Sequence, residues 1–139
     1  MHLGFSSMNT LFDPPPPVLA RYLEERGFES LWYGEHSHIP CVQKTPYPGG
    51  GELPTPYKHM MDPYVSLMAA AAATTKLRLG TGIALLMERD VFSQAKTIAT
   101  LDQLSGGRVI IGTGVGWNKE EFSNVSRQPW NKRSGVLRE

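Results

Sequence analysis

The sequence has a single cysteine, no long hydrophobic run and almost no excess of charge. Cys41 stands alone among 139 residues, which excludes a disulfide within the chain and fits a reducing compartment. No stretch approaches the roughly 20 apolar residues of a membrane helix, and the first residues lack the basic segment of a signal peptide. We therefore expect a cytoplasmic protein with no membrane partner. The net charge of +1, from scattered lysines and arginines, argues against a nucleic-acid partner.

What the sequence does contain is a regular alternation of short apolar runs and helical periodicity. Strands are predicted at residues 2–6, 30–34, 76–86 and from 108 onward, with helices between them. A fourth helix is predicted to begin near Asn118 and to continue to the end of the chain. Strands separated by helices require a parallel sheet with right-handed crossovers. The sequence thus predicts one α/β domain over residues 1–139, and the pattern alone fits a doubly wound sheet or part of a (β/α)8 barrel equally well.

One segment, residues 37–61, is much longer than an ordinary connection. It holds five prolines and a glycine triplet, Gly49 to Gly51. Loops of this length are either functional lids or disordered insertions. We favour a lid or binding loop, because it leaves the carboxyl end of a predicted strand, where parallel α/β folds place their sites.

A glycine-rich stretch follows the last predicted strand. Gly112, Gly114 and Gly116 give a G-x-G-x-G spacing, and Trp117 stands near the place of the third glycine of a dinucleotide fingerprint. The spacing therefore argues against that fingerprint. Two interpretations remain open: a strand end that lets a flat ring or a phosphate approach the backbone, or a flexible turn.

An acid and an imidazole lie together at the end of the second predicted strand. Glu35 and His36 could bind a ring or move a proton, and His36 with His38 has the spacing of two metal ligands on one strand. The later strands offer no further ligands, so we predict no metal site. A purely structural role for His36 is the other alternative. In the third strand, Gly80 and Gly82 indicate a bulge or the close approach of a ligand.

Five segments together carry a resemblance to a known family. They are SLWYGEHSHIP, TPYPGGGELP, LRLGTGIALL, ATLDQLSGGRVIIGTGVGWNKEEF and the terminal KRSGVLRE. The chain resembles the luciferase-like monooxygenases, above all the branch that uses the deazaflavin coenzyme F(420) in place of FMN. The resemblance implies a TIM (β/α)8 barrel, of which this chain would hold the first four βα units. It also implies a flavin- or deazaflavin-dependent oxidoreductase that performs hydride transfer or monooxygenation on a small organic substrate.

The resemblance also implies a site. Glu35 would contact the cofactor ring, and His36 would face the substrate as the proton-transfer residue. Gly82 and Ile83 match a non-prolyl cis peptide bond that backs the ring. Trp117 and Glu121 would seat the loop. The remaining cofactor contacts that the resemblance implies are Phe5, Ser6, Gly114, Gly116 and Asn118.

The length of the chain leaves two further possibilities open. A TIM barrel takes about 250 residues, and half a barrel leaves two strand edges and an apolar inner face. We therefore expect a homodimer or higher oligomer that closes the barrel. The alternatives to a working oxidoreductase are a catalytically silent half-barrel that oligomerises, and a metal-dependent hydrolase that uses His36 and His38.

Overall fold

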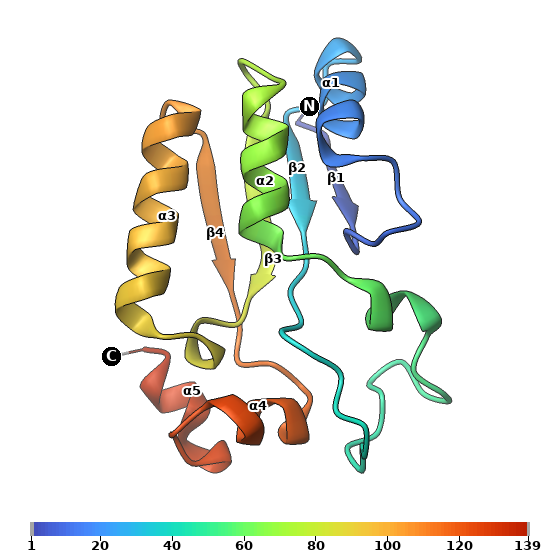
Figure 1. Cartoon of the computed structure of the whole chain (residues 1–139), viewed down its shortest axis with the longest axis vertical. Coiled ribbons are helices and arrows are strands. Elements are labelled where there is room, and N and C mark those ends of the chain that lie inside the picture. Colours follow the sequence, from blue (N-terminus) through green and yellow to red (C-terminus); the bar gives the residue numbers. More distant parts are fainter. Residues whose placement is uncertain (1, 139) are drawn as a thin grey trace.

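The computed structural model, which describes residues 2–138, contains one four-stranded sheet with all strands parallel (Figure 1). The strand order follows the chain. The strands are β1 (Gly4–Ser7), β2 (Ser30–Tyr33), β3 (Arg78–Ala84) and β4 (Val109–Thr113). The predicted parallel α/β architecture is confirmed, and each strand overlaps the segment expected from the sequence.

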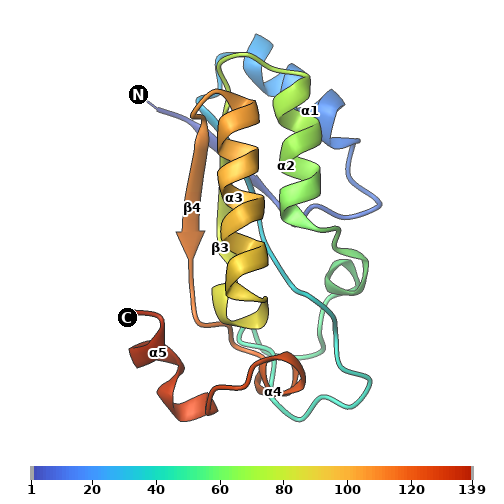
Figure 2. The same cartoon turned by 60° about the vertical axis from the view of Figure 1, so that its left-hand side comes forward.

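Three long helices cover one face of this sheet and leave the other face open. They are α1 (Pro16–Glu25), α2 (Pro63–Ala72) and α3 (Val91–Ser105), and Figure 2 shows them stacked on the same side of the strands. Two short helices, α4 (Lys119–Val125) and α5 (Arg133–Val136), lie beyond the carboxyl ends of the strands. Short 3-10 turns, η1 (Thr55–His59), η2 (Leu86–Glu88) and η3 (Trp130–Lys132), complete the structure.

The helices begin and end where the sequence supplies capping groups. The Asp62 carboxylate accepts a hydrogen bond from the Val65 N–H at 3.0 Å, and Asp90 accepts one from the Ser93 N–H at 2.8 Å. Each bond satisfies a backbone donor that the first helical turn leaves free. Gly106 ends α3 in the left-handed conformation at φ 76°, which glycine adopts without steric cost. The ends of the helices are thus fixed by local chemistry.

The core lies between the sheet and the three helices. Leu31 of β2 and Leu79 of β3 pair in register and are fully buried, and Leu67 of α2 packs into the same cluster. On the opposite face of the sheet, Trp32 spreads its indole over Gly80, where an added Cβ would come within 2.2 Å of the ring. Gly80 is therefore required by the packing of Trp32.

The prediction for the last helix is wrong in its second half. α4 ends at Val125, and the chain is extended at Ser126 and again at Pro129 before η3 and α5 begin. Proline has no N–H to continue a helix, and it disfavours helical conformation in the residue before it.

Within residues 2–138, no helix is both long enough and apolar enough to cross a bilayer.

Arg108, just before β4, ties the carboxyl end of α2 to the start of β3. Its guanidinium donates to the carbonyls of Ala71, Thr74 and Leu77 at 2.9–3.1 Å, and to the Thr74 hydroxyl at 2.9 Å. Carbonyls at the end of a helix have no partner within the helix. One side chain therefore satisfies several backbone groups that packing has removed from water.

Replacing Arg108 should weaken the whole fold. We expect Arg108→Met to lower the free energy of unfolding by about 2–4 kcal/mol, because several partly buried carbonyls lose a charged donor. Arg108→Lys keeps the charge but not the planar set of donors of a guanidinium. Its free energy of unfolding should therefore lie between that of the unmodified protein and that of Arg108→Met. Urea unfolding followed by circular dichroism measures the difference. An unchanged midpoint for Arg108→Met would contradict this role.

Candidate functional site

A cleft of about 290 Å³ opens at the carboxyl ends of β1, β2 and β3. The end of a parallel strand exposes backbone and side chains that no further pairing covers, so parallel α/β folds bind ligands here. Side chains from the strand ends, the 37–61 loop and the turn before α4 line it. The lining residues are Ser6, Ser7, Met8, Gly34, Glu35, His36, Tyr57, Met60, Gly82, Ile83 and Trp117.

The structure brings six of the residues singled out in the sequence to this cleft. They are Ser6, Glu35, His36, Gly82, Ile83 and Trp117. The other lining residues, Ser7, Met8, Gly34, Tyr57 and Met60, were missed. Ser7, Met8 and Gly34 reach the cleft because they lie at or next to the ends of β1 and β2. Tyr57 and Met60 were marked only by their position in the long loop, and they reach the cleft because that loop folds back over the strand ends.

Four other residues lie outside the lining of the cleft. Phe5 pairs in register with Leu31 and packs its ring edge-on against Phe28, with centroids 6.4 Å apart. Gly114 faces Ile83, where an added Cβ would meet the Ile83 side chain at 2.1 Å. The other two are Gly116 and Asn118. That atom is the free end of a flexible side chain, so this contact alone does not require a glycine at 114.

The β3 end of the cleft has an irregular backbone. The pairing of β3 with β4 shifts register between Thr81 and Ala84, and the Gly82–Ile83 peptide bond is cis. The bulge expected from the glycines and the cis bond implied by the resemblance are both confirmed. The irregularity leaves the Ile83 side chain 40% exposed at the cleft.

Glu35 is a buried member of an ion-pair network. Its carboxylate accepts hydrogen bonds from the Leu85 N–H at 2.7 Å and from Arg89 Nε at 2.5 Å, and its side chain is 1% exposed. Arg89 also donates to Asp62, which caps α2, at 2.7 Å. Burial opposes ionisation of Asp62, but hydrogen bonds from the Val65 N–H and Arg89 outweigh it and lower the Asp62 pKa. Glu35 thereby fixes the segment that follows the cis bond.

His36 is held from both sides of its ring. Nδ1 lies 2.5 Å from Glu121 Oε2, and Trp117 Nε1 donates to Nε2 at 3.3 Å. An indole nitrogen is only a donor, so Nε2 acts as an acceptor and Nδ1 carries the hydrogen of the neutral ring. The imidazole is 9% exposed and lines the cleft.

The 37–61 loop is folded over the site and anchored there. The Thr45 N–H donates to Glu120 at 3.2 Å, and Met60 forms an isolated bridge with Thr10. Tyr47 packs edge-on against Trp117 and Tyr57, with centroids 5.8 Å and 5.4 Å apart. The loop is therefore an ordered cover of the cleft.

Glu121 of α4 joins this cover to the strand ends. Besides contacting His36, its carboxylate accepts from the Ser37 N–H at 2.7 Å and from the Ser37 hydroxyl at 3.3 Å. Its own backbone N–H is capped by Asn118. The expectation that Glu121 and Trp117 seat the loop is confirmed by these contacts.

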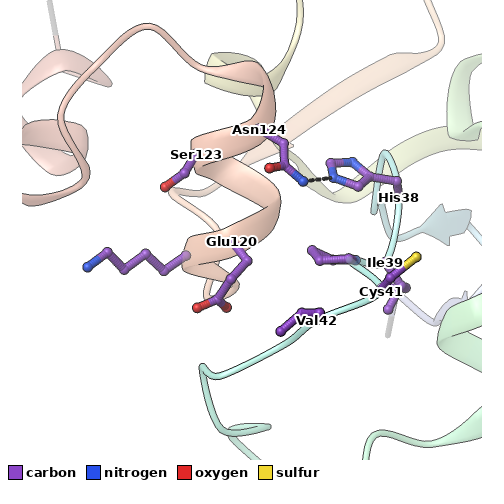
Figure 3. Close-up of a pocket in the computed structure, with 9 residues that line it drawn as sticks. His38, Ile39, Cys41, Val42, Glu120, Ser123 and Asn124 are labelled. Carbon is purple, nitrogen blue, oxygen red and sulfur yellow. Dashed lines mark hydrogen bonds between the residues drawn. The ribbon is translucent and has the colours of Figure 1, made fainter.

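A second, open hollow of about 530 Å³ lies outside the loop, between its first residues and α4 (Figure 3). His38 turns into it, with Nε2 of its ring 2.8 Å from Asn124 Nδ2 and Nδ1 2.9 Å from the Ser37 hydroxyl. Residues 2–138 contain no group of three or more His, Cys, Asp or Glu side chains placed to hold a metal ion. Ser37, whose hydroxyl contacts both His38 and Glu121, links the two histidines into one hydrogen-bonded network.

Removing the Glu121 charge should loosen the loop. Glu121→Gln offers one acceptor in place of two, so we expect the free energy of unfolding to fall by about 1–3 kcal/mol. Tryptic cleavage after the exposed Lys44 should become faster. Urea unfolding and timed proteolysis measure these effects, with Glu52→Gln, an exposed carboxylate of the same loop, as the control. Equal cleavage rates in both variants would contradict the anchoring role.

Comparisons with known proteins agree with this geometry. A family model described as luciferase-like monooxygenase matches residues 18–139. The uncharacterized protein Rv0953c of Mycobacterium tuberculosis (strain ATCC 25618 / H37Rv) is 40% identical over 142 residues, which cover 100% of this chain and 50% of that protein. The chain spans about half the length of the curated relatives of this kind.

Solved structures share the same strand and helix arrangement. The coenzyme F(420)-dependent tetrahydromethanopterin reductase from Methanopyrus kandleri matches with a TM-score of 0.63 and 30% identity, over 88% of this chain and 29% of that one. A second match is the oxygenating constituent of 3,6-diketocamphane monooxygenase from Pseudomonas putida, in complex with FMN. Its TM-score is 0.73 at 16% identity, and the match covers 98% of this chain and 37% of that one. The four βα units correspond to about half of such a TIM barrel. The chain belongs to the luciferase-like monooxygenase family.

Proposed function

We propose that this chain forms part of a flavin- or deazaflavin-dependent oxidoreductase, and that the cleft at the strand ends binds the cofactor ring beside a small organic substrate. The observation that carries the proposal is the meeting of the cis Gly82–Ile83 bulge and the doubly held His36 in one cleft. Membership of the family supports the reaction class.

The residues of the cleft fit a flat ring with apolar faces and a polar edge. Ile83, Met8 and Met60 offer apolar surface, and Ser6 and Ser7 add hydroxyl groups at the end of β1. Within residues 2–138, no lysine or arginine lines this cleft. The phosphate-bearing tail of such a cofactor would therefore be bound by groups beyond the cleft.

Each cleft residue has a distinct task in this proposal. Ile83 would back the ring, while Ser6 would bind its edge. The bound cofactor supplies the redox chemistry, as hydride exchange for a deazaflavin or oxygen activation for FMN. His36 Nε2 would exchange a proton with the substrate once Trp117 gives way to it. Glu35, buried and bonded to Arg89, holds the ring-backing segment in place.

Tyr57 would supply a neutral donor on the loop side. Burial, together with its hydrogen bond to Tyr47, raises the pKa of Tyr57 to about 12. The phenol therefore keeps its proton across the physiological range. A carbonyl or hydroxyl of a substrate is the group that such a donor recognises.

The choice of cofactor follows the relatives. The deazaflavin coenzyme F(420) is proposed first, supported by the Methanopyrus kandleri reductase at 30% identity. FMN is the alternative, supported by the fold shared with the FMN complex of the Pseudomonas putida enzyme. Cofactor contacts from Phe5, Gly114, Gly116 and Asn118 stay predictions. The last three would need a ring that extends past the cleft toward β4, whereas Phe5 lies in β1 at the other edge of the sheet. The single cysteine supports a reducing, cytoplasmic setting.

Filling the cleft should abolish cofactor binding. Ser6→Trp places a large ring at the end of β1, and we expect it to weaken binding of coenzyme F(420) or FMN at least tenfold, a loss of about 1.4 kcal/mol or more. Ser123→Trp, in the second hollow of Figure 3, is the matched control and should bind normally. Titration with the fluorescence of each cofactor as the readout measures both variants.

Two outcomes of that titration would contradict the proposal. Failure of the unmodified chain to bind either cofactor at high concentration would favour the catalytically silent half-barrel. Equal loss in the Ser6 and Ser123 variants would place the binding elsewhere.

The open face of the sheet supports a second proposal, that two copies complete one barrel. Among residues 2–138, β1 and β4 each have one unpaired edge, and helices cover only one face of the sheet. A two-fold axis along the barrel would set β1 of each copy against β4 of the other. The contact would bury the inner face that Trp32 now partly covers.

This arrangement predicts an oligomer in solution. Sedimentation velocity at micromolar concentration should give the mass of a dimer or a larger assembly, because burying the inner face and pairing two edges stabilises association. A stable, folded monomer at that concentration would contradict it.

A further inference from the structure

Ser37 lies between the two histidines of the segment that follows β2, and its hydroxyl contacts a group on each side. The hydroxyl oxygen is 3.3 Å from Glu121 Oε1 and 2.9 Å from His38 Nδ1. The other oxygen of Glu121, Oε2, contacts Nδ1 of His36 at 2.5 Å. A continuous chain of hydrogen-bonding groups therefore runs from His36, which lines the cleft, to His38.

The two ends of this chain lie in different surroundings. The His36 imidazole is 9% exposed and the Glu121 side chain is 1% exposed, so the inner half of the chain is shielded from water. At the outer end, His38 turns into the open hollow shown in Figure 3, where its Nε2 lies 2.8 Å from the exposed Asn124 amide. The chain thus connects a buried ring with the solvent.

The hydrogen bonds of the chain converge on the Glu121 carboxylate. The Asn124 Nδ2 group can only donate, so Nε2 of a neutral His38 accepts and its Nδ1 carries the hydrogen. This Nδ1–H donates to the Ser37 hydroxyl, and the hydroxyl donates to Glu121 Oε1. The His36 Nδ1–H reaches the same carboxylate from the other side. Each neighbouring pair is therefore close enough to pass a proton.

The His36 ring has no comparable second route. Within residues 2–138, its hydrogen-bond partners are Glu121 and Trp117, and an indole nitrogen only donates. Tyr57 meets the ring edge-on, with centroids 5.3 Å apart, and Glu35 directs its carboxylate to other partners. Glu121 is therefore the group that can take the proton from His36 Nδ1.

We propose that Ser37 and His38 are relay residues, which carry protons between the His36–Glu121 pair and the solvent. Within residues 2–138, neither residue lines the cleft, so both act through Glu121 and His36. The inference rests on the proposed function only for the origin of the proton that reaches His36.

The proton balance of the relay closes in three steps. When His36 Nε2 takes a proton from a substrate, the Nδ1 hydrogen moves to Glu121 Oε2, which leaves a neutral ring and a neutral acid. The carboxyl group then turns over and gives this proton to the Ser37 oxygen, while the Ser37 hydrogen moves to Nδ1 of the His38 tautomer that carries its hydrogen on Nε2. The His38 imidazolium finally releases the Nε2 hydrogen to water, which restores the arrangement in the structure.

The test is the rate at which the His36 Nδ1 hydrogen exchanges with water, measured by NMR saturation transfer on the whole chain without cofactor. Ser37→Ala and His38→Phe should each slow this exchange at least about tenfold, because each removes a group that both accepts and donates a proton. Ser37→Thr, which keeps the hydroxyl, should retain most of the rate. Ser123→Ala, in the same hollow but outside the chain, should leave the rate unchanged.

The direction of the change separates a relay from a structural support. The Ser37 hydroxyl also helps to hold Glu121. If support were its whole role, Ser37→Ala would loosen the buried pair and make the exchange faster. A slower exchange in a folded variant, checked by circular dichroism, is therefore specific to proton transfer.

Added imidazole gives a second measurement. His38→Ala leaves room in the open hollow, so imidazole in solution can replace the lost ring, and the exchange rate should rise with its concentration. In Ser37→Ala the chain is cut closer to Glu121, and the same imidazole should have no effect. This comparison separates rescue of the relay from direct attack on His36 through the cleft.

Three results would overturn the proposal. They are an unchanged exchange rate in both Ser37→Ala and His38→Phe, a faster rate in either, and equal acceleration by imidazole in His38→Ala and Ser37→Ala. Ser37 is exposed and His38 is half-buried, so these substitutions leave the core intact. Because no cofactor is present, failure of the relay is distinct from failure of cofactor binding.

Discussion

The contact between the Glu121 carboxylate and the end of β2 is the interaction on which the site depends. It joins α4 to His36 and Ser37, and it comes from a side chain that is itself almost completely buried. A buried charge is costly unless its hydrogen bonds are satisfied, so this carboxylate holds its partners tightly. On the other side of the strand end, Arg89 binds Glu35 in the same manner. Two adjacent residues just beyond the end of β2, Glu35 and His36, are thus fixed by charged side chains from two different parts of the chain.

The architecture could be predicted from the sequence because its signals are local. Asp62 and Asp90 cap helices, and Gly106 ends one, each through contacts within a few residues. The apolar runs indicated strands, and because helices separate these strands, the sheet had to be parallel. The end of the chain could not be predicted as well, because Pro129 breaks a helix whose polar sequence otherwise continues. Nor does the sequence show that η1 forms inside the long loop, since its anchors belong to distant segments.

In the site, too, the residues marked by local sequence could be predicted, and their distant partners could not. His36 and Glu35 were found because they follow a predicted strand, and the cis bond at Gly82 came from the resemblance. The partners of these residues lie 50 to 85 positions away along the chain, and no local pattern indicates such contacts. The glycines show the limit most clearly. Gly80, which suggested room for a ligand, is accounted for by the Trp32 ring of the protein itself.

The central claim is that a flavin-type ring lies against Ile83 at the cis bulge. Methyl NMR of the unmodified chain tests it most directly, because a stacked aromatic ring shifts the resonance of a methyl group beneath it. On addition of coenzyme F(420) or FMN, the Ile83 methyl resonances should move, while those of Ile39 and Val42 in the second hollow should stay in place. Shifts confined to Ile39 and Val42, or no shift at saturating cofactor, would contradict the account.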